Sequence, residues 1–131
     1  MATRTLIIPC AGKSSRFNTE LPKWLLTHPS GKIMAWESII GLPLDSFDKI
    51  ILVCLKKHLT DSLRAIIYND FDSLVNFELL ELESETHSAS HTVSECIKLK
   101  NINGAIFIKD SDDYFEVDEI NSNEVCTYSL N

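Results

Sequence analysis

Phosphate-binding chemistry is suggested by the stretch that follows the first apolar run of the sequence. Gly12 allows the backbone to turn tightly and to approach a ligand closely, and the backbone N–H groups of such a turn can cradle phosphate oxygens. Lys13 and Arg16 follow at once, and Lys23 comes directly after Pro22. Both cation types complement phosphate, and arginine suits bidentate contact. The stretch predicts a phosphate cradle, and an ordinary surface loop with solvated charges is the alternative.

Acidic residues follow a later apolar run, "AIFIK", and point to a metal ion. Asp110, Asp112 and Asp113 come directly after this run. Carboxylates at the end of a strand can hold Mg²⁺, which usually takes one or two protein carboxylates together with waters and substrate phosphates. An acidic solvated turn is the alternative. A phosphate cradle and a magnesium site on neighbouring strands would serve one reaction, so we expect the two loops to meet.

Alternating apolar runs and helical patterns predict the elements that position these loops. Residues 11–30 form a long loop, and Gly41 and Pro43 end the first helix. Strands separated by helices form βαβ units and a mainly parallel sheet, in which ligands bind beyond the carboxyl ends of the strands. We expect strands over residues 5–10, 49–55, 75–83, 105–109 and 125–130, and helices over residues 33–40, 59–69 and 88–100.

Helical periodicity indicates which side chains of the last two helices face the core. Thr60 is the expected N-cap of the first of them. The buried positions should be Leu59, Leu63, Ile66 and Ile67 in that helix, and Ala89, Val93, Cys96 and Ile97 in the next. Trp24 and Trp36 are expected to be packing residues.

Composition bounds the class of protein. The 131 residues suffice for one domain spanning residues 1–131, and 44% hydrophobic and 24% charged residues are typical of a soluble globular chain. A net charge of −7 argues against a general nucleic-acid binder. No apolar run approaches the length that a bilayer span needs, and the N-terminus lacks the apolar centre of a signal peptide. We therefore expect a cytoplasmic protein without a membrane partner.

Cysteines and histidines give no metal or disulfide pattern. Cys10, Cys54, Cys96 and Cys126 form no C-x-x-C pair, so we expect them to be small apolar residues. The histidines at positions 87 and 91 have helical spacing, but no third ligand is evident, and solvated histidines at a helix end are expected.

Two common nucleotide-binding motifs are excluded by spacing. "AGKSS" looks like the end of a Walker A motif, but its first glycine would have to stand where Ile7 is. Pro22 also lies where the helix after a P-loop should run. A G-x-G-x-x-G dinucleotide fingerprint is absent. A P-loop kinase and a dehydrogenase are therefore both disfavoured.

With these residues in view, the chain resembles the sugar-1-phosphate nucleotidyltransferases, also called nucleoside-diphosphate-sugar pyrophosphorylases. The family opens with a strand, A-G-x-G-[ST]-R-[FML], a variable gap and P-K. Here residues 11–17 read "AGKSSRF", and "PK" follows at residues 22–23. A second family motif, a strand ending in a magnesium-binding aspartate, resembles "AIFIKDSDDYF", with Asp112 the best match and Asp110 next. The segment "ETHSASHTVSECIK" resembles the helix opening that helps to read the nucleotide.

The resemblance implies a fold and a reaction. The fold is α/β, a Rossmann-like three-layer α/β/α arrangement of the nucleotide-diphospho-sugar transferase type. The reaction is Mg²⁺-dependent transfer of a nucleoside monophosphate from a nucleoside triphosphate to a sugar 1-phosphate or a similar phosphorylated alcohol, with release of pyrophosphate. It belongs to nucleotide-sugar and polysaccharide biosynthesis.

Residue roles follow from the same resemblance. Lys13 and Arg16 would hold the β- and γ-phosphates, and Lys23 would stabilise charge on the α-phosphate. Asp112, with Asp110, would hold Mg²⁺. The nucleotide would be lined by Ala11, Gly12, Lys13, Ser14 and Ser15, with Ser88 on the base-reading side.

The chain departs from the family at two points. Ser14 replaces the second glycine of the opening motif. The sequence ends at Asn131, whereas the family's catalytic domain continues, so the resemblance implies a truncated, nucleotide-binding front part. The alternative function is a non-catalytic nucleotide-binding or interaction module of the same fold, and a scaffold without a ligand is a further one. An uncovered sheet edge makes such a part a candidate for a homo-oligomer.

Overall fold

The computed structural model describes residues 3–11 and 23–109. Within them, parallel strands form one sheet in the order β3-β2-β1-β4. The chain first builds outward from β1 to β3 and then crosses back to place β4 on the other side of β1. The strand order therefore switches direction between β1 and β4. The bounds are Arg4–Pro9 for β1, Lys49–Leu55 for β2, Phe77–Leu82 for β3 and Ala105–Ile108 for β4.

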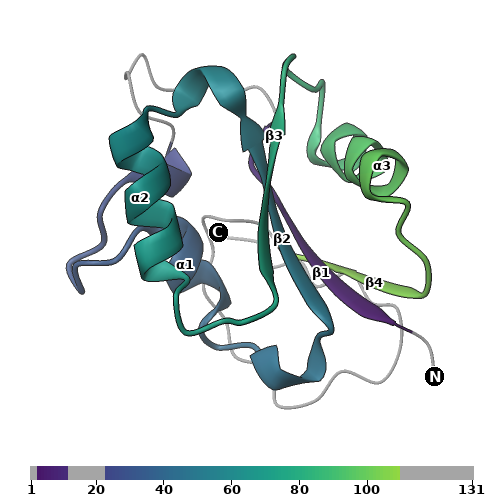
Figure 1. Cartoon of the computed structure of the whole chain (residues 1–131), viewed down its shortest axis with the longest axis horizontal. Coiled ribbons are helices and arrows are strands. Elements are labelled where there is room, and N and C mark those ends of the chain that lie inside the picture. The colour runs from purple at the N-terminus through teal and green to yellow at the C-terminus, as the bar shows by residue number, and fades with distance from the viewer. Residues whose placement is uncertain (1–2, 12–22, 110–131) are drawn as a thin grey trace, which may run out of the picture.

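Helices cover both faces of this sheet. Figure 1 shows α1 (Met34–Ile39) and α2 (Asp61–Asp70) on one side and α3 (Ala89–Lys100) on the other. Short 3₁₀ helices lie at Lys23–Leu25 (η1), Leu44–Ser46 (η2) and Lys56–His58 (η3). The predicted α/β fold, with helix layers on both sides of a parallel sheet, is confirmed. None of the helices in the described part of the chain is both long enough and apolar enough to cross a bilayer.

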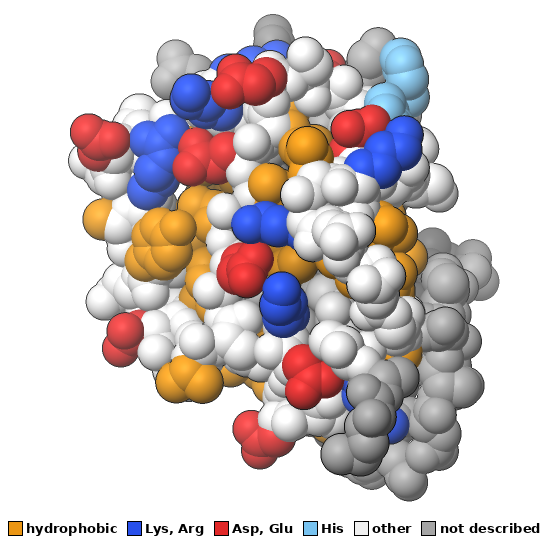
Figure 2. Space-filling model, turned by 45° about the vertical axis from the view of Figure 1, so that its right-hand side comes forward, with side chains coloured by type: hydrophobic (Ala, Val, Ile, Leu, Met, Phe, Trp, Pro, Cys, Tyr) orange, Lys and Arg blue, Asp and Glu red, His pale blue; other side chains and the backbone are white. Residues whose placement is uncertain are grey.

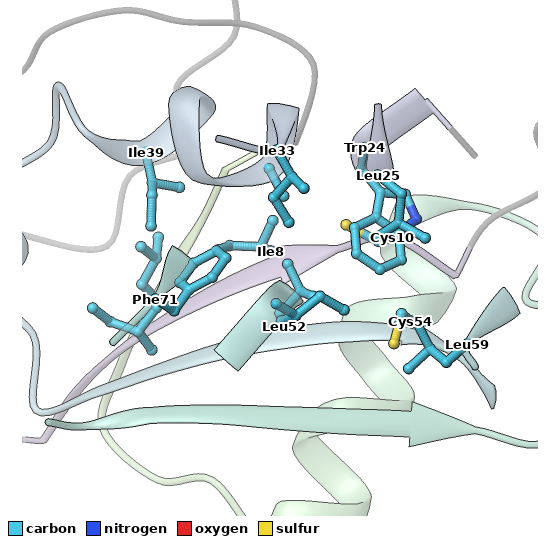
Figure 3. Packing of buried hydrophobic residues seen from close by; sticks show 14 of the residues in the cluster. Ile8, Cys10, Trp24, Leu25, Ile33, Ile39, Leu52, Cys54, Leu59 and Phe71 are labelled. Carbon is cyan, nitrogen blue, oxygen red and sulfur yellow. The ribbon is translucent and has the colours of Figure 1, made fainter. Parts of the chain in front are cut away.

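Strand alternation divides the core between the two faces. On the α1/α2 side, Leu6 and Ile8 of β1 pack with Leu52 of β2, and Figure 3 shows Ile33, Ile39 and Phe71 closing over them. On the α3 side, Ile7 and its neighbours from β2 and β3 pack against Val93 and Cys96. Both central strands are buried on both faces, as their near-continuous apolar runs predicted. Each such side chain contributes about 1.5–3 kcal/mol by burial.

Helix ends are fixed by specific hydrogen bonds. The Thr60 hydroxyl accepts from the Leu63 N–H (3.2 Å), which confirms Thr60 as the N-cap of α2. A carboxylate oxygen of buried Asp70 accepts from the Ile33 N–H (2.8 Å) and so satisfies the start of α1 from the far end of α2. Asn101 ends α3 in the left-handed conformation, which asparagine tolerates well.

Two predicted element boundaries are wrong. The strand expected from residue 75 begins at Phe77, and Val75 is fully exposed in the preceding turn. The Asn76 side chain donates to the Phe47 carbonyl (2.7 Å) and fixes where β3 starts. The helix expected over residues 59–69 begins after Leu59, and Ile66, predicted to face the core, is 45% exposed. The strand predicted over residues 125–130 lies outside the described residues.

Candidate functional site

The two predicted ligand-binding loops leave from neighbouring strands. β1 and β4 pair in parallel from Arg4 with Ala105 to Ile7 with Ile108. The backbone continues this pairing past the end of β4, where the Lys109 N–H donates to the Ile7 carbonyl (3.1 Å). Both strands therefore end at the carboxyl edge of the sheet, at the switch in strand order. This is the position at which open α/β sheets bind ligands.

The first of these loops starts from a fixed point. Ala11 has no exposed surface and belongs to the apolar cluster on the α3 side. Its carbonyl accepts from the Thr86 N–H (3.2 Å), and the preceding Cys10 N–H donates to Val53 of β2 (2.7 Å). The backbone of Cys10 and Ala11 is therefore held between β2 and the connection from β3 to α3. Gly12, Lys13, Ser14, Ser15 and Arg16 lie outside the described residues.

A compact hydroxyl network lies beneath this anchor. The hydroxyls of buried Thr86 and Thr92 are in hydrogen-bond contact, and both also lie within hydrogen-bond distance of the Ser88 carbonyl oxygen (3.3 and 3.1 Å), so that one hydroxyl donates to the other and the second donates to this carbonyl. The Ser88 hydroxyl accepts from the His91 N–H (3.1 Å) as the N-cap of α3. Ser88, the predicted base-reading residue, is thus the N-cap of α3, and its hydroxyl is engaged in that role. The sequence did not reveal Thr86, because a lone threonine in a polar loop carries no signal of burial.

Lys23 is brought to the same edge by its neighbours. It begins η1, and the next two residues, Trp24 and Leu25, are each only 4% exposed. Figure 3 shows both packed beside Cys10 at the end of β1. The expected packing role of Trp24 is confirmed, and its indole N–H has no hydrogen-bond partner in the described part of the chain. The backbone of Lys23 is therefore held close to the point where the first loop begins.

Further cations follow β2 at this edge, and acids from the β3–α3 connection pair with them. Lys56 contacts Glu83 (3.5 Å), and Lys57 contacts Glu85 (2.7 Å). Burial, together with the charge of Lys57, lowers the pKa of His58, against a smaller opposing effect of Glu85. His58 is therefore neutral at pH 7. The segment "KKH" after an apolar strand was a readable signal for these residues, since it occupies the same strand end as the other loops.

The described histidines and cysteines form no metal site. His87 and His91 stack with ring centroids 5.3 Å apart, and His91 Nδ1 accepts from the His87 N–H (3.0 Å). Figure 2 shows histidine side chains side by side at the upper edge of the molecule. No group of three His, Cys, Asp or Glu side chains with metal-binding geometry occurs within residues 3–11 and 23–109. Asp110 and Asp112 lie outside these residues.

Buried thiols are the observed state of the described cysteines. Cys10, Cys54 and Cys96 are buried and form no disulfide among the described residues. Burial raises the pKa of Cys54 to about 12 and that of Cys96 to about 11. Both therefore remain neutral thiols at pH 7, in agreement with the expected apolar role. Cys126 lies outside the described residues.

Comparison with known proteins finds similarity among solved structures. No protein-family model matches the chain, and neither does any curated protein sequence. Among solved structures, the chain is similar to the bifunctional IspDF from Campylobacter jejuni, with 20% sequence identity and a TM-score of 0.47. The alignment covers 84% of this chain and 26% of that protein, so the chain spans about a quarter of the length of this neighbour.

Proposed function

We propose that the chain is the nucleotide-binding part of a Mg²⁺-dependent nucleotidyltransferase. The observation that carries the proposal is the pairing of β1 with β4, which starts a glycine- and cation-bearing loop and an acidic loop at one edge of the sheet. The anchoring of Ala11 on Thr86 and of η1 beside Cys10 supports it, because both hold the ends of the first loop close together. The motif resemblance supplies the reaction class.

The proposed reaction needs no covalent nucleophile from the protein. A phosphate oxygen of a sugar 1-phosphate, or of a similar phosphorylated alcohol, attacks the α-phosphorus of a nucleoside triphosphate. The bond from the α-phosphorus to the bridging oxygen breaks, and pyrophosphate leaves with that oxygen. Lys13 and Arg16 stabilise the leaving pyrophosphate, and Lys23 stabilises charge on the α-phosphate. Such catalysis depends on positioning and on charge stabilisation.

Mg²⁺ fits the donor chemistry of the acidic loop. The loop follows Lys109, whose backbone is paired to β1 at the carboxyl edge, and carboxylate oxygens are the ligands that Mg²⁺ takes in phosphate-binding sites. Asp112, with Asp110, would hold the ion. When bound, it would supply charge neutralisation at the phosphate oxygens.

A pyrophosphate-release assay tests the function. Each common nucleoside triphosphate is combined with Mg²⁺ and a panel of sugar 1-phosphates and phosphorylated alcohols, and released pyrophosphate is measured. Release that requires one triphosphate, one acceptor and Mg²⁺ supports the enzyme. Triphosphate binding without release for any acceptor contradicts it and supports the non-catalytic binding module. No shift in melting temperature with any triphosphate and Mg²⁺ contradicts both and supports a scaffold, since a ligand that prefers the native state raises its stability.

Replacing Lys23 separates catalysis from folding. Lys23→Ala should abolish transfer and leave the melting temperature within about 2 °C of the parent, because a loop lysine contributes little packing. The matched control is Lys32→Ala, since Lys32 is a partly exposed lysine in the same connection between β1 and α1. This control should keep full turnover. Unchanged turnover in Lys23→Ala would remove Lys23 from the site.

A further inference from the structure

A second polar cavity lies at the opposite, amino edge of the sheet. It has a volume of about 160 Å³ and opens between the starts of β1 and β2 and the C-terminal end of α3. In Figure 1 this is the end of the sheet nearest the label N. Ile102 provides the one apolar side chain of its lining. The polar lining residues are Thr3, Thr5, Lys49, Lys100, Asn101 and Asn103.

Thr5 has a hydroxyl without a partner in this lining. Its side chain has no exposed surface, and its Oγ1 makes no hydrogen bond within residues 3–11 and 23–109. Alternation along β1 places Thr5 on the α3 side, the side of Ile7, and the sheet register sets it beside Lys49. Buried hydroxyls are nearly always hydrogen-bonded, because leaving one unpaired costs about 1–3 kcal/mol. This hydroxyl is therefore a donor in the wall of the cavity that a water molecule or an oxygen of a ligand would satisfy.

The charge of the lining favours an anion. Lys49 and Lys100 are positive, both threonines and both asparagines can donate hydrogen bonds, and none of the lining residues is acidic. Glu78 pairs with Lys100 at 3.2 Å, and a carboxylate oxygen of Asp48 accepts from the Arg4 N–H at 2.8 Å, but neither acid lines the cavity. The negative end of the α3 dipole opposes an anion here, and Lys98 and Lys100 in the last turn of the helix offset it.

We propose that this cavity binds a small oxyanion, a free phosphate or the phosphate group of a small molecule. Lys49 and Lys100 supply the charge, and the Thr5 hydroxyl donates to one oxygen of the ligand. The cavity volume of about 160 Å³ is large enough to take a phosphate group. The site lies across the sheet from the proposed triphosphate site and does not depend on it.

Phosphate titration with residue-level detection tests the site. Inorganic phosphate is added to the full chain at constant ionic strength, with acetate and chloride as comparison anions, and amide signals are followed by NMR. The expected result is saturable shifts at Thr5, Lys100 and Asn103. Equal responses to phosphate and chloride at these positions would overturn the proposal, and so would shifts confined to the carboxyl edge at Ala11 and Thr86. Testing a small sugar phosphate beside inorganic phosphate distinguishes the two sources of the group.

Matched variants locate the interaction. Thr5→Val keeps the side-chain shape and should weaken phosphate binding roughly tenfold, while its melting temperature without phosphate is equal to or above that of the parent. Lys49→Ala should weaken binding by a similar factor, and Lys98→Ala, at the same helix end but outside the lining, should leave affinity unchanged. Phosphate affinity that is the same in Thr5→Val and Lys49→Ala as in the parent would overturn the proposal.

Discussion

The two edges of the parallel sheet satisfy their polar groups in different ways. At the carboxyl edge, hydroxyls and charges from different segments pair with one another: Thr86 with Thr92, Lys56 with Glu83, and Lys57 with Glu85. Among the described residues, ring nitrogens of Trp24 and His58 are the buried side-chain atoms without a partner at this edge. At the amino edge, backbone contacts hold the chain together, as where the Ala105 N–H donates to the Thr3 carbonyl (2.8 Å), yet the nearby Thr5 hydroxyl has no partner among the described residues.

This difference suggests different roles for the side chains at the two edges. The described hydroxyls and lysines of the carboxyl edge are paired with other side chains, so we expect the groups that bind a nucleotide to come mainly from the two predicted loops. The amino edge provides its own donors directly from strand ends and from the end of α3. The side chains at one edge should therefore matter mainly for positioning, and those at the other edge for binding.

The largest loss of stability is expected from a substitution at the amino edge. Gly104 has φ +92°, and a Cβ there would lie 2.3 Å from the Thr3 carbonyl oxygen and 2.9 Å from its nitrogen. Gly104→Ala should lower the free energy of unfolding by about 3 kcal/mol or more, because backbone must shift in addition to the conformational strain. Urea denaturation measures this loss.

Gly31 provides the matched control for that prediction. It has a similar φ of +95°, but a Cβ there would meet no atom within 4 Å. Gly31→Ala should therefore cost only the left-handed strain of about 1–2 kcal/mol. Equal losses of stability in the two alanine variants would contradict the prediction, because they would show that the backbone of Thr3 accommodates a Cβ at residue 104 without cost.

Parallel threonine replacements compare the edges directly. Thr86→Val removes a paired buried hydroxyl and should lower the free energy of unfolding by about 1 kcal/mol. Thr5→Val removes an unpaired one and should leave that free energy unchanged or raise it by up to about 1 kcal/mol in phosphate-free buffer. Equilibrium denaturation of both variants gives the comparison. A clear loss of stability in Thr5→Val would mean that its hydroxyl is satisfied in the native protein.

Local sequence patterns predicted most of the fold. The apolar run of β2 matched the observed Lys49–Leu55, and α3 began one residue after the predicted start, because its N-cap is Ser88. The errors lie where tertiary contacts decide. Val75 suits a strand by type, but the hydrogen bond from Asn76 to Phe47 starts β3 later. That contact joins segments far apart in the sequence, so periodicity cannot reveal it.

The candidate site was predictable in part. Parallel pairing and the order of elements indicated that the loops after β1 and β4 share one edge, and the register between these strands confirms that their bases are neighbours. The support from Thr86 and the burial of Lys109 were not predictable. Both depend on which residues the β3–α3 connection and β4 bring against β1. The roles of Arg16, Asp110 and Asp112 stay predictions.

The smallest expected effect tests whether the ion pairs near the carboxyl edge stabilise the fold. Hydrogen bonding to Arg64 holds the pKa of Glu81 below its usual 4.5, with Nη2 to Oε1 at 2.7 Å. A lowered carboxyl pKa contributes stability above pH 4.5, and this contribution is lost as pH falls through the folded-state value. Glu81→Gln should therefore be less stable than the parent at pH 7, and this difference in the free energy of unfolding should narrow below pH 4.

The control is Glu83→Gln, because the exposed Glu83 carboxylate is paired with Lys56 at 3.5 Å. Its gap in stability relative to the parent should be smaller. A gap for Glu81→Gln that is constant from pH 7 to pH 3 would show that packing, rather than charge, joins α2 to β3 at this pair.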